Sequence, residues 1–371
     1  MRLNWLRSLT EDPGPFATVV LDATSDEPKG PDEVRLRWRN LRDDLARQGA
    51  DDRVLRVLDD AVDRGDPPDG TAARVLVAGS GGLLLDRFVE VPPSGSGTAT
   101  WSEVPDLMTV LGAVPEEIRA VAVFVDDNGG KVRGPGESEP EDVTGDASGP
   151  VHKASTAGPG EGAADARVEE TWKANARAVA DRVEKLTSGS GAQQVVLTGT
   201  SPARARLLDE LTPHTAELVF EVEHSGGDFP EDLPATMLKA ADEVRAARRA
   251  QSLERFGAAA GRADGFAVTG LSGVLAAVRA QAVDTLVLDG DAAPEGEVWT
   301  GSRGEPSELA ADRDELTALG SEPDAAVAVV PALIRAVAAA DGDLVLAGSN
   351  DDVTLDEGLG ALLRFPIGPA S

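Results

Sequence analysis

The sequence contains no cysteine and no long hydrophobic run. Without cysteine the chain forms no disulfide, offers no thiol nucleophile and provides no cysteine ligand for zinc. No apolar run approaches the roughly 20 residues that a membrane helix needs. The N-terminal segment MRLNWLRSLTEDPG also lacks the apolar length and the small-residue cleavage site of a signal peptide. We therefore expect a cytoplasmic protein with no membrane association.

Positive charge is scarce as well. The sequence has 35 lysines and arginines against 65 aspartates and glutamates, a formal net charge of −30, and no lysine follows Lys239. The negative electrostatic field of such a charge repels polyanions at long range, whereas nucleic-acid binding usually depends on a basic patch. An acidic proteome rich in Ala, Gly and Arg is one explanation of this composition. Any contact with RNA must come from local clusters of cations that act within a Debye length of about 8–10 Å.

Histidine is rare, with three residues at His152, His214 and His224. A serine–histidine–aspartate set has little support, because neither Ser201 nor Ser272 has both flanking glycines of a nucleophile elbow. The sequence has no HExxH motif, and its close carboxylates lack the spacing of a calcium loop. We predict no metal site.

The segment GSGGLLL at 79–85 is the nearest match to a nucleotide-binding loop. A dinucleotide fingerprint needs a third glycine, where this sequence has Leu84, and a following helix whose N-terminus holds the pyrophosphate. A strand pattern follows instead, and no GxxxxGK[ST] loop occurs. We therefore interpret residues 80–82 as a hairpin turn and predict no cofactor.

The length of 371 residues favours two or three domains. Strand and helix patterns alternate along the whole chain, which is typical of α/β layers. We predict three consecutive α/β domains, at 1–117, 118–257 and 258–371. In the outer two, the expected helices are 31–49, 50–64, 271–281 and 324–340, and the expected strands are 17–23, 73–79, 83–91, 283–289, 297–302, 343–349 and 361–366.

The middle domain begins with a strand and hairpin, AVAVFVDDNGGKVR, at 120–133. Residues 134–149 are rich in Gly, Pro, Glu and Asp and are expected to be exposed. A loop at 151–168 then leads into an amphipathic helix, TWKANARAVADRVEKL, and we expect Trp172 and Val179 of this helix, together with Val168 just before it, to face the core. The expected elements that follow are a strand at 194–200, a helix at 202–211, a strand at 216–224 and a helix from about 232 past 249.

The loop at 151–168 is the remaining candidate for a functional site. Its glycines Gly158, Gly160 and Gly162 permit close approach of the backbone to a partner. His152 and Lys153 stand at its base and can donate hydrogen bonds to phosphate or ribose oxygens. On the following helix, spacing places Lys173 and Arg177 on one face. The alternative is a flexible surface loop beside a solvated helix face.

The segments PVHKASTAG, ANARAVADRVEKL and DEGLGALLRF, in this order and layout, resemble the bacterial archaeo-eukaryotic release factor family. The likeness extends to its actinobacterial branch, which is related to the ribosome hibernation factor Balon. The resemblance implies a middle domain whose protruding loop reaches the peptidyl-transferase centre of the ribosome. It also implies a third domain like the kink-turn-binding ribosomal-protein fold, and a first domain in the A site alongside elongation factor Tu.

One departure from the family pattern concerns the chemistry. No Gly-Gly-Gln occurs in the sequence, and Gly191-Ala192-Gln193 lies beyond the helix that follows the loop. In release factors that glutamine positions water against the peptidyl-tRNA ester. The resemblance therefore implies a non-enzymatic, ribosome-associated factor of the hibernation or stress type, which contacts the rRNA of the A site. The alternative is a ribosome rescue hydrolase or nuclease that uses His152 as a general base on peptidyl-tRNA.

Overall fold

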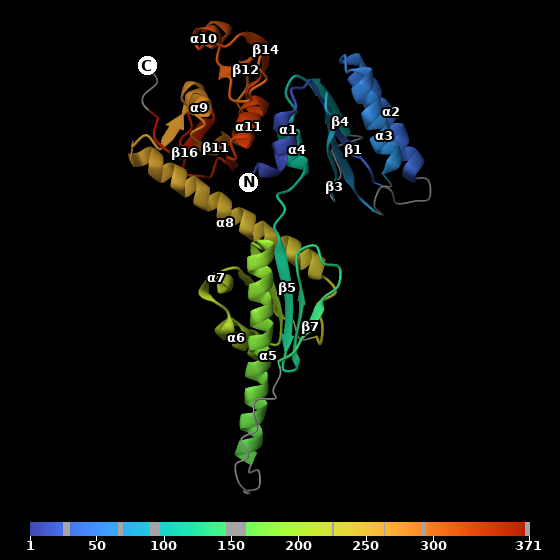
Figure 1. Cartoon of the computed structure of the whole chain (residues 1–371), viewed down its shortest axis with the longest axis vertical. Coiled ribbons are helices and arrows are strands. Elements are labelled where there is room, and N and C mark those ends of the chain that lie inside the picture. Colours follow the sequence, from blue (N-terminus) through green and yellow to red (C-terminus); the bar gives the residue numbers. More distant parts are fainter. Residues whose placement is uncertain are drawn as a thin grey trace. The chain divides into compact units, whose positions relative to one another are not determined.

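The structure is a computed structural model that describes residues 1–24, 30–65, 70–89, 97–145, 161–224, 226–262, 264–290 and 294–367. Helices and strands alternate as expected for a mixed α/β protein (Figure 1). They divide into two units. Unit 1 combines Met1–Glu116 with Arg248–Ser371, and unit 2 is Glu117–Ala247.

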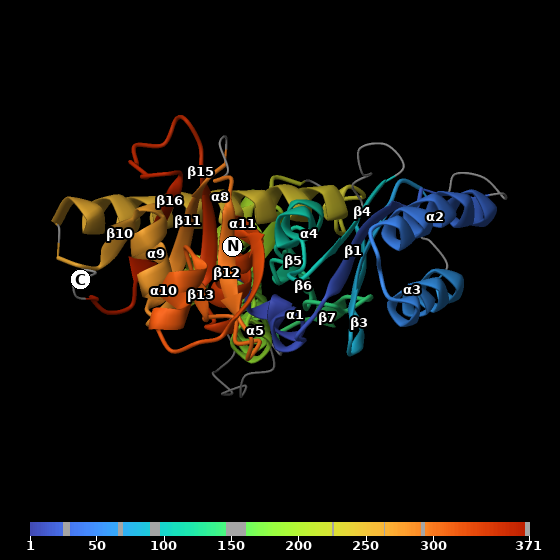
Figure 2. The ribbon, with the colours of Figure 1, turned by 90° about the horizontal axis from the view of Figure 1, so that it is seen from above.

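The N-terminal part of unit 1 is an antiparallel sheet whose two central strands are buried on both faces. Its strands are in the order β3 (Gly82–Val89), β2 (Ala73–Gly79), β1 (Phe16–Asp22), β4 (Gly97–Ser102). Alternate side chains of a strand point to opposite faces. Val19 therefore packs under α2 (Gly30–Arg47) and α3 (Asp52–Arg64), whereas its neighbour Val20 belongs to a different cluster. Figure 2 shows both helices on one side of this sheet.

The predicted hairpin at GSGGLLL is confirmed. β2 ends at Gly79, Ser80 and Gly81 form the turn, and β3 begins at Gly82 in antiparallel pairing. The carboxylate of Asp12 accepts hydrogen bonds from the Gly81 amide at 2.7 Å and the Ser80 hydroxyl at 3.2 Å. The Gly81 amide is thus directed at a buried side chain of the protein itself, and a strand rather than a helix follows, so no helix N-terminus can hold a pyrophosphate.

The C-terminal part of unit 1 is a sheet in the order β10 (Ala267–Thr269), β16 (Leu359–Leu363), β11 (Val283–Asp289), β15 (Asp343–Ala347). The second half of α8 (Leu233–Arg262) packs on one face through Phe256, which is fully buried. Helices α9 (Gly270–Arg279) and α11 (Val329–Ala339) contribute to the cluster on the other face. A small sheet, β13 (Leu309–Ala310), β12 (Glu297–Gly301), β14 (Pro323–Ala328), stands beside α10 (Arg313–Ala318).

The two ends of the chain share one hydrophobic core. Short helices η1 (Asn4–Leu6) and α1 (Arg7–Glu11) and helix α4 (Leu107–Ala113) contribute leucines to the same cluster as α9 and α11. The N-terminal ammonium of Met1 donates to the carbonyl oxygen of Leu344 at 2.7 Å. The structure therefore joins the predicted first and third domains into one unit, because these contacts link segments more than 300 residues apart.

Unit 2 is a five-stranded sheet in the order β7 (Glu141–Val143), β6 (Gly129–Arg133), β5 (Ala120–Asp126), β8 (Gln194–Gly199), β9 (Val219–Glu221). The strands β5, β8 and β9 are parallel, and β5, β6 and β7 form an antiparallel meander. One face is covered by α5 (Glu161–Ser190) and α6 (Ser201–Glu210), with α7 (Pro213–Ala216) between α6 and β9 in the chain. The first half of α8 covers the other face.

One expectation about secondary structure was wrong. Residues 324–340 are not one helix, because their first third is the strand β14, which pairs with β12, and α11 begins at Val329. Pro331 lies in the first turn of α11, where its missing N–H costs no helical hydrogen bond. Residues 136–142 are exposed, as expected for this part of the segment 134–149, and Glu141–Val143 form the short strand β7, which pairs with β6.

Candidate functional site

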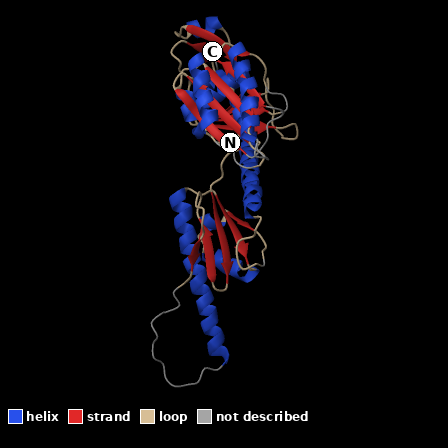
Figure 3. Cartoon of the chain, turned by 90° about the vertical axis from the view of Figure 1, so that its right-hand side faces the viewer, coloured by secondary structure: helices blue, strands red, loops and turns tan. Residues whose placement is uncertain are grey.

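The N-terminal end of α5 extends past the sheet of unit 2. A helix of 30 residues is about 45 Å long, whereas β5, with seven residues, spans about 23 Å. One face of the helix can therefore be covered along part of its length only. Val179 and Val183 are fully buried, whereas Val168 is 45% exposed. Figures 1 and 3 show α5 continuing beyond the strands.

The predicted loop does not extend to residue 168. Residues 161–168 belong to α5, because the segment EGAADARVEE is rich in alanine and glutamate, which favour a helix. Gly162 is thus a helical residue. His152, Lys153, Gly158 and Gly160 lie outside the described residues. The expectation that Val168 faces the core was also wrong, since the sheet does not extend that far.

Asn175 fixes the point from which the chain leaves the sheet of unit 2. This side chain is 5% exposed and sits on the buried stripe of α5. Its Oδ1 accepts a hydrogen bond from the amide of Gly145 at 2.9 Å, and its Nδ2 donates to the carbonyl oxygen of Asp127 at 3.1 Å. Asn175 therefore ties α5 both to the β5–β6 turn and to the residue that precedes segment 146–160.

Gly145 permits this close contact because it has no side chain. A Cβ atom at this position would lie 2.3 Å from the carbonyl oxygen of Ala174 in α5. The backbone after β7 thus touches the backbone of α5 directly. A polar residue on a buried helical stripe is the signal that identifies Asn175 in the sequence, and sequence reasoning missed it.

The cations of this region lie beside carboxylates. Lys173 is 3.9 Å from Glu169 and Arg177 is 3.1 Å from Glu210. Lys173 and Arg177 are both exposed, as the helical spacing predicts. Partnered, exposed cations add little net positive potential. The described part of α5 is therefore no strong electrostatic site for RNA.

Trp172 is the aromatic side chain of this surface. The guanidinium of Arg206 lies over its ring, 4.4 Å from the ring centroid, and also forms an ion pair of 3.0 Å with Asp127. Such a cation–π contact contributes about 0.5–1 kcal/mol at exposed sites. Trp172 is half-buried rather than part of the core, so its interaction is with α6 and not with the sheet.

The opposite half of α5 is clamped by Glu184. Its carboxylate accepts hydrogen bonds from the Thr212 amide at 2.8 Å and from the Thr215 hydroxyl at 2.7 Å. Burial raises the pKa of Glu184, but these hydrogen bonds outweigh it and hold the pKa below its ordinary value of 4.5. These hydrogen bonds connect the C-terminal half of α5 to the start of α7.

We expect Glu184→Gln to lower the free energy of unfolding by about 1 kcal/mol, because a neutral amide accepts weaker hydrogen bonds. Because the folded pKa is depressed, the contribution is complete above the ordinary pKa of 4.5 and is lost as the pH falls through the folded value. Urea unfolding at pH 7 and pH 3.5 tests this. If the free energy of unfolding of the variant were lower than that of the parent by the same amount at both pH values, this pH dependence would be contradicted.

Within the described ranges, no group of three or more His, Cys, Asp or Glu side chains is placed to hold a metal ion. In the same part of the chain, every helix is too short or too polar to cross a lipid bilayer.

Two kinds of comparison bear on the family. Residues 119–262 match the model of the Bacterial archaeo-eukaryotic release factor family 2. The chain is also 31% identical over 374 residues to two Mycobacterium tuberculosis proteins, Uncharacterized protein MT2704 (strain CDC 1551 / Oshkosh) and Uncharacterized protein Rv2629 (strain ATCC 25618 / H37Rv). Each match covers 98% of this chain and 97% of the relative.

Solved structures of similar proteins include Pelota. The crystal structure of Archaeoglobus fulgidus Pelota is 14% identical and covers 99% of this chain and 92% of that chain, with a TM-score of 0.35. A model of ribosome-bound archaeal Pelota and ABCE1 gives 14% identity, coverage of 99% and 95%, and a TM-score of 0.39. The sequence matches carry the assignment: the chain belongs to the bacterial archaeo-eukaryotic release factor family, with family 2 matched over residues 119–262.

Proposed function

We propose that this release-factor-like protein is a cytoplasmic, ribosome-associated factor that occupies the A site of idle or stalled ribosomes and blocks tRNA entry. The observation that carries the proposal is the overhang of α5 in a chain of this family. The N-terminal part of α5, where Val168 is 45% exposed, continues beyond the sheet and gives unit 2 a long, narrow projection. Such a projection suits insertion into a confined RNA site.

The position of the glutamines supports binding without peptide release. Gln193 and Gln194 follow the C-terminal end of α5, so the length of that helix, about 45 Å, separates them from Glu161. Gln194 is buried, and its side-chain amide donates to the carbonyl oxygen of Ala240 at 2.8 Å. Neither glutamine can act at the projecting end of α5. A factor that binds through this end of α5 therefore cannot use the side-chain amide of Gln193 or Gln194 to position water near Glu161.

The charge pattern supports delivery by a protein partner. The net charge is −30, and Lys173 and Arg177 already lie beside glutamates. Affinity for RNA alone is therefore expected to be low. We propose elongation factor Tu as the partner that brings the protein to the ribosome, with His152 and Lys153 making contacts to the rRNA of the A site and peptidyl-transferase centre.

Sedimentation with purified 70S ribosomes tests the proposal. The full-length protein should comigrate with 70S particles at low salt, and elongation factor Tu should extend comigration to higher salt. Bound protein should also lower the binding of aminoacyl-tRNA to the A site. Absence of comigration at every salt concentration, with and without elongation factor Tu, would overturn the proposal.

The same complexes separate binding from hydrolysis. Stalled ribosomes carrying labelled peptidyl-tRNA should keep their peptide when the protein binds. Release or cleavage of peptidyl-tRNA that disappears with His152→Ala would instead favour a rescue hydrolase or nuclease, with that imidazole as the general base.

A further inference from the structure

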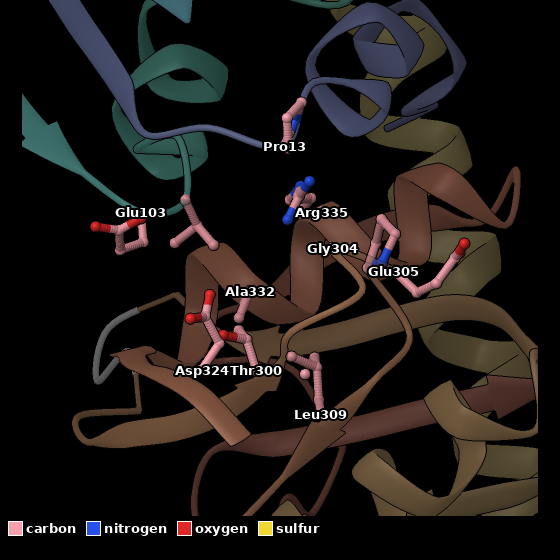
Figure 4. A pocket seen from close by; sticks show the side chains of 12 residues that line it. Pro13, Glu103, Thr300, Gly304, Glu305, Leu309, Asp324, Ala332 and Arg335 are labelled. Carbon is pink, nitrogen blue, oxygen red and sulfur yellow. The ribbon is translucent and has the colours of Figure 1, made fainter. Parts of the chain in front are cut away.

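The hollow beside Arg335 in unit 1 is too small for an organic ligand (Figure 4). Its volume is about 40 Å³, which suffices for water. The Nη2 of Arg335 donates hydrogen bonds to the carbonyl oxygens of Asp12 at 2.8 Å and Thr10 at 3.3 Å. This side chain therefore links α11 to the N-terminal segment, and a larger partner must bind unit 1 at its outer surface.

Strand β4 forms an outer edge of the N-terminal sheet of unit 1. Within the described ranges it pairs with β1 alone, in the strand order β3, β2, β1, β4. In an antiparallel edge strand, every second residue directs its backbone N–H and C=O away from the sheet. Ala99 and Trp101 are such residues, because the carbonyl oxygen of Ala99 and the amide of Trp101 bond to a side chain outside the sheet.

The side chain that bonds to this edge is Gln48. Its Nε2 donates to the carbonyl oxygen of Ala99 at 3.0 Å, and its Oε1 accepts from the amide of Trp101 at 2.8 Å. A peptide group of a neighbouring strand would make the same two kinds of contact. Gln48 directly follows α2, and the left-handed backbone of Gly49, with a φ of +93°, turns the chain away from the helix there.

Strand β4 has none of the features that usually keep an edge strand from pairing. Its sequence, GTATWS, contains no charged residue and no proline. The strand at the opposite edge of the same sheet, β3, carries Asp86 and Arg87. The contact with Gln48 therefore takes the place of the charges that protect other edges.

A second copy of β4 complements this edge. In an antiparallel pair centred on Thr100, Ala99 of one copy lies opposite Trp101 of the other, and the two residues exchange both backbone hydrogen bonds. A small and a large side chain then share one face of the sheet. On the other face Thr100 meets Thr100, and Thr98 meets Ser102, pairs that stabilise a sheet. No charged side chains meet across this register.

We propose that the outer edge of β4 is a surface for pairing with a second copy of this chain, and that the side chain of Gln48 keeps this edge closed. Pairing in this register needs the Ala99 carbonyl and the Trp101 amide, which Gln48 occupies, so the two arrangements exclude each other. The contact of Gln48 therefore favours the monomer. The proposal does not depend on ribosome binding.

Sedimentation equilibrium of the full-length chain tests the proposal. Salt at about 0.15 M screens the repulsion between two acidic copies beyond about 8 Å. Gln48→Ala should lower the dissociation constant of the dimer at least about tenfold relative to the parent, because pairing no longer breaks the hydrogen bonds of Gln48. Gln251→Ala, which changes an exposed glutamine of α8, is the matched control and should behave as the parent does. A Gln48→Ala variant that stays monomeric, or pairs no more tightly than the parent, would overturn the proposal.

Two substitutions added to Gln48→Ala identify the surface that pairs. Ala99→Pro removes an outward N–H and leaves the hydrogen bonds to β1 in place. Thr98→Lys adds a charge at an exposed position of the edge without changing the backbone. Each should return the variant to the monomer, while hydrogen exchange of β1 amides reports that the sheet is intact. A dimer that persists with both substitutions would place the contact elsewhere and reject the proposal.

Discussion

Gly145→Ala is expected to destabilise unit 2 by about 2 kcal/mol or more. The added Cβ would lie 2.3 Å from the carbonyl oxygen of Ala174 and 2.4 Å from its carbon, both backbone atoms of α5. Relief of this overlap requires the chain to move away from α5, which breaks the hydrogen bond between the Gly145 amide and Asn175. Hydrogen exchange of β5 and β8 amides reports the loss, because these central strands open only when unit 2 unfolds.

A second glycine of the same unit is the matched control. Gly189 lies in the last turn of α5, and an added Cβ there would meet nothing within 4 Å. Gly189→Ala should therefore leave stability unchanged or raise it by up to about 1 kcal/mol, because alanine favours the helix. Equal destabilisation by the two substitutions would contradict the proposed packing of Gly145 on α5.

The double substitution His152→Ala with Lys153→Ala is expected to weaken ribosome binding about tenfold. The reason is the loss of contacts to phosphate and ribose oxygens, which also carry the salt dependence of binding. The dissociation constant should therefore depend less steeply on salt concentration in the variant. Sedimentation of labelled protein with 70S ribosomes at several salt concentrations measures both quantities.

Lys185→Ala is the control for the change in charge. Lys185 is exposed on α5 near the end opposite Glu161, so it lies away from the proposed contact. Its replacement should leave affinity and salt dependence close to those of the parent. A tenfold loss in Lys185→Ala, or none in the double variant, would show that the binding surface lies elsewhere.

The pattern of apolar residues predicts most strands and helices of the two units, because the apolar face of each element packs against a hydrophobic core. The same pattern predicts the wrong element where hydrogen bonding to another strand determines the secondary structure. β14 has the alternating exposure of an edge region and reads as a continuation of the alanine-rich helix, but pairing with β12 fixes it as a strand. The shared core of Met1–Glu116 and Arg248–Ser371 also escapes prediction, because no local signal shows that Met1 meets Leu344.

The exposure of the two cations on α5 could be predicted from the sequence, whereas their partners could not. The helical spacing of Lys173 and Arg177 correctly gives their exposure. The neutralising partner Glu210 belongs to α6 and cannot be inferred from spacing within α5. Asn175 has a signal in the sequence, a polar residue on an apolar stripe, but its two partners come from distant segments. The roles of His152, Lys153, Gly158 and Gly160, and the placement in the branch related to Balon, stay predictions.

Cryo-electron microscopy of the protein bound to 70S ribosomes would show whether the overhanging end of α5 is the part that enters the ribosome. We expect density for α5 in the A site of the large subunit, with Glu161 directed toward the peptidyl-transferase centre. A bound state in which this end of α5 faces solvent, or in which the A site is empty, would contradict it.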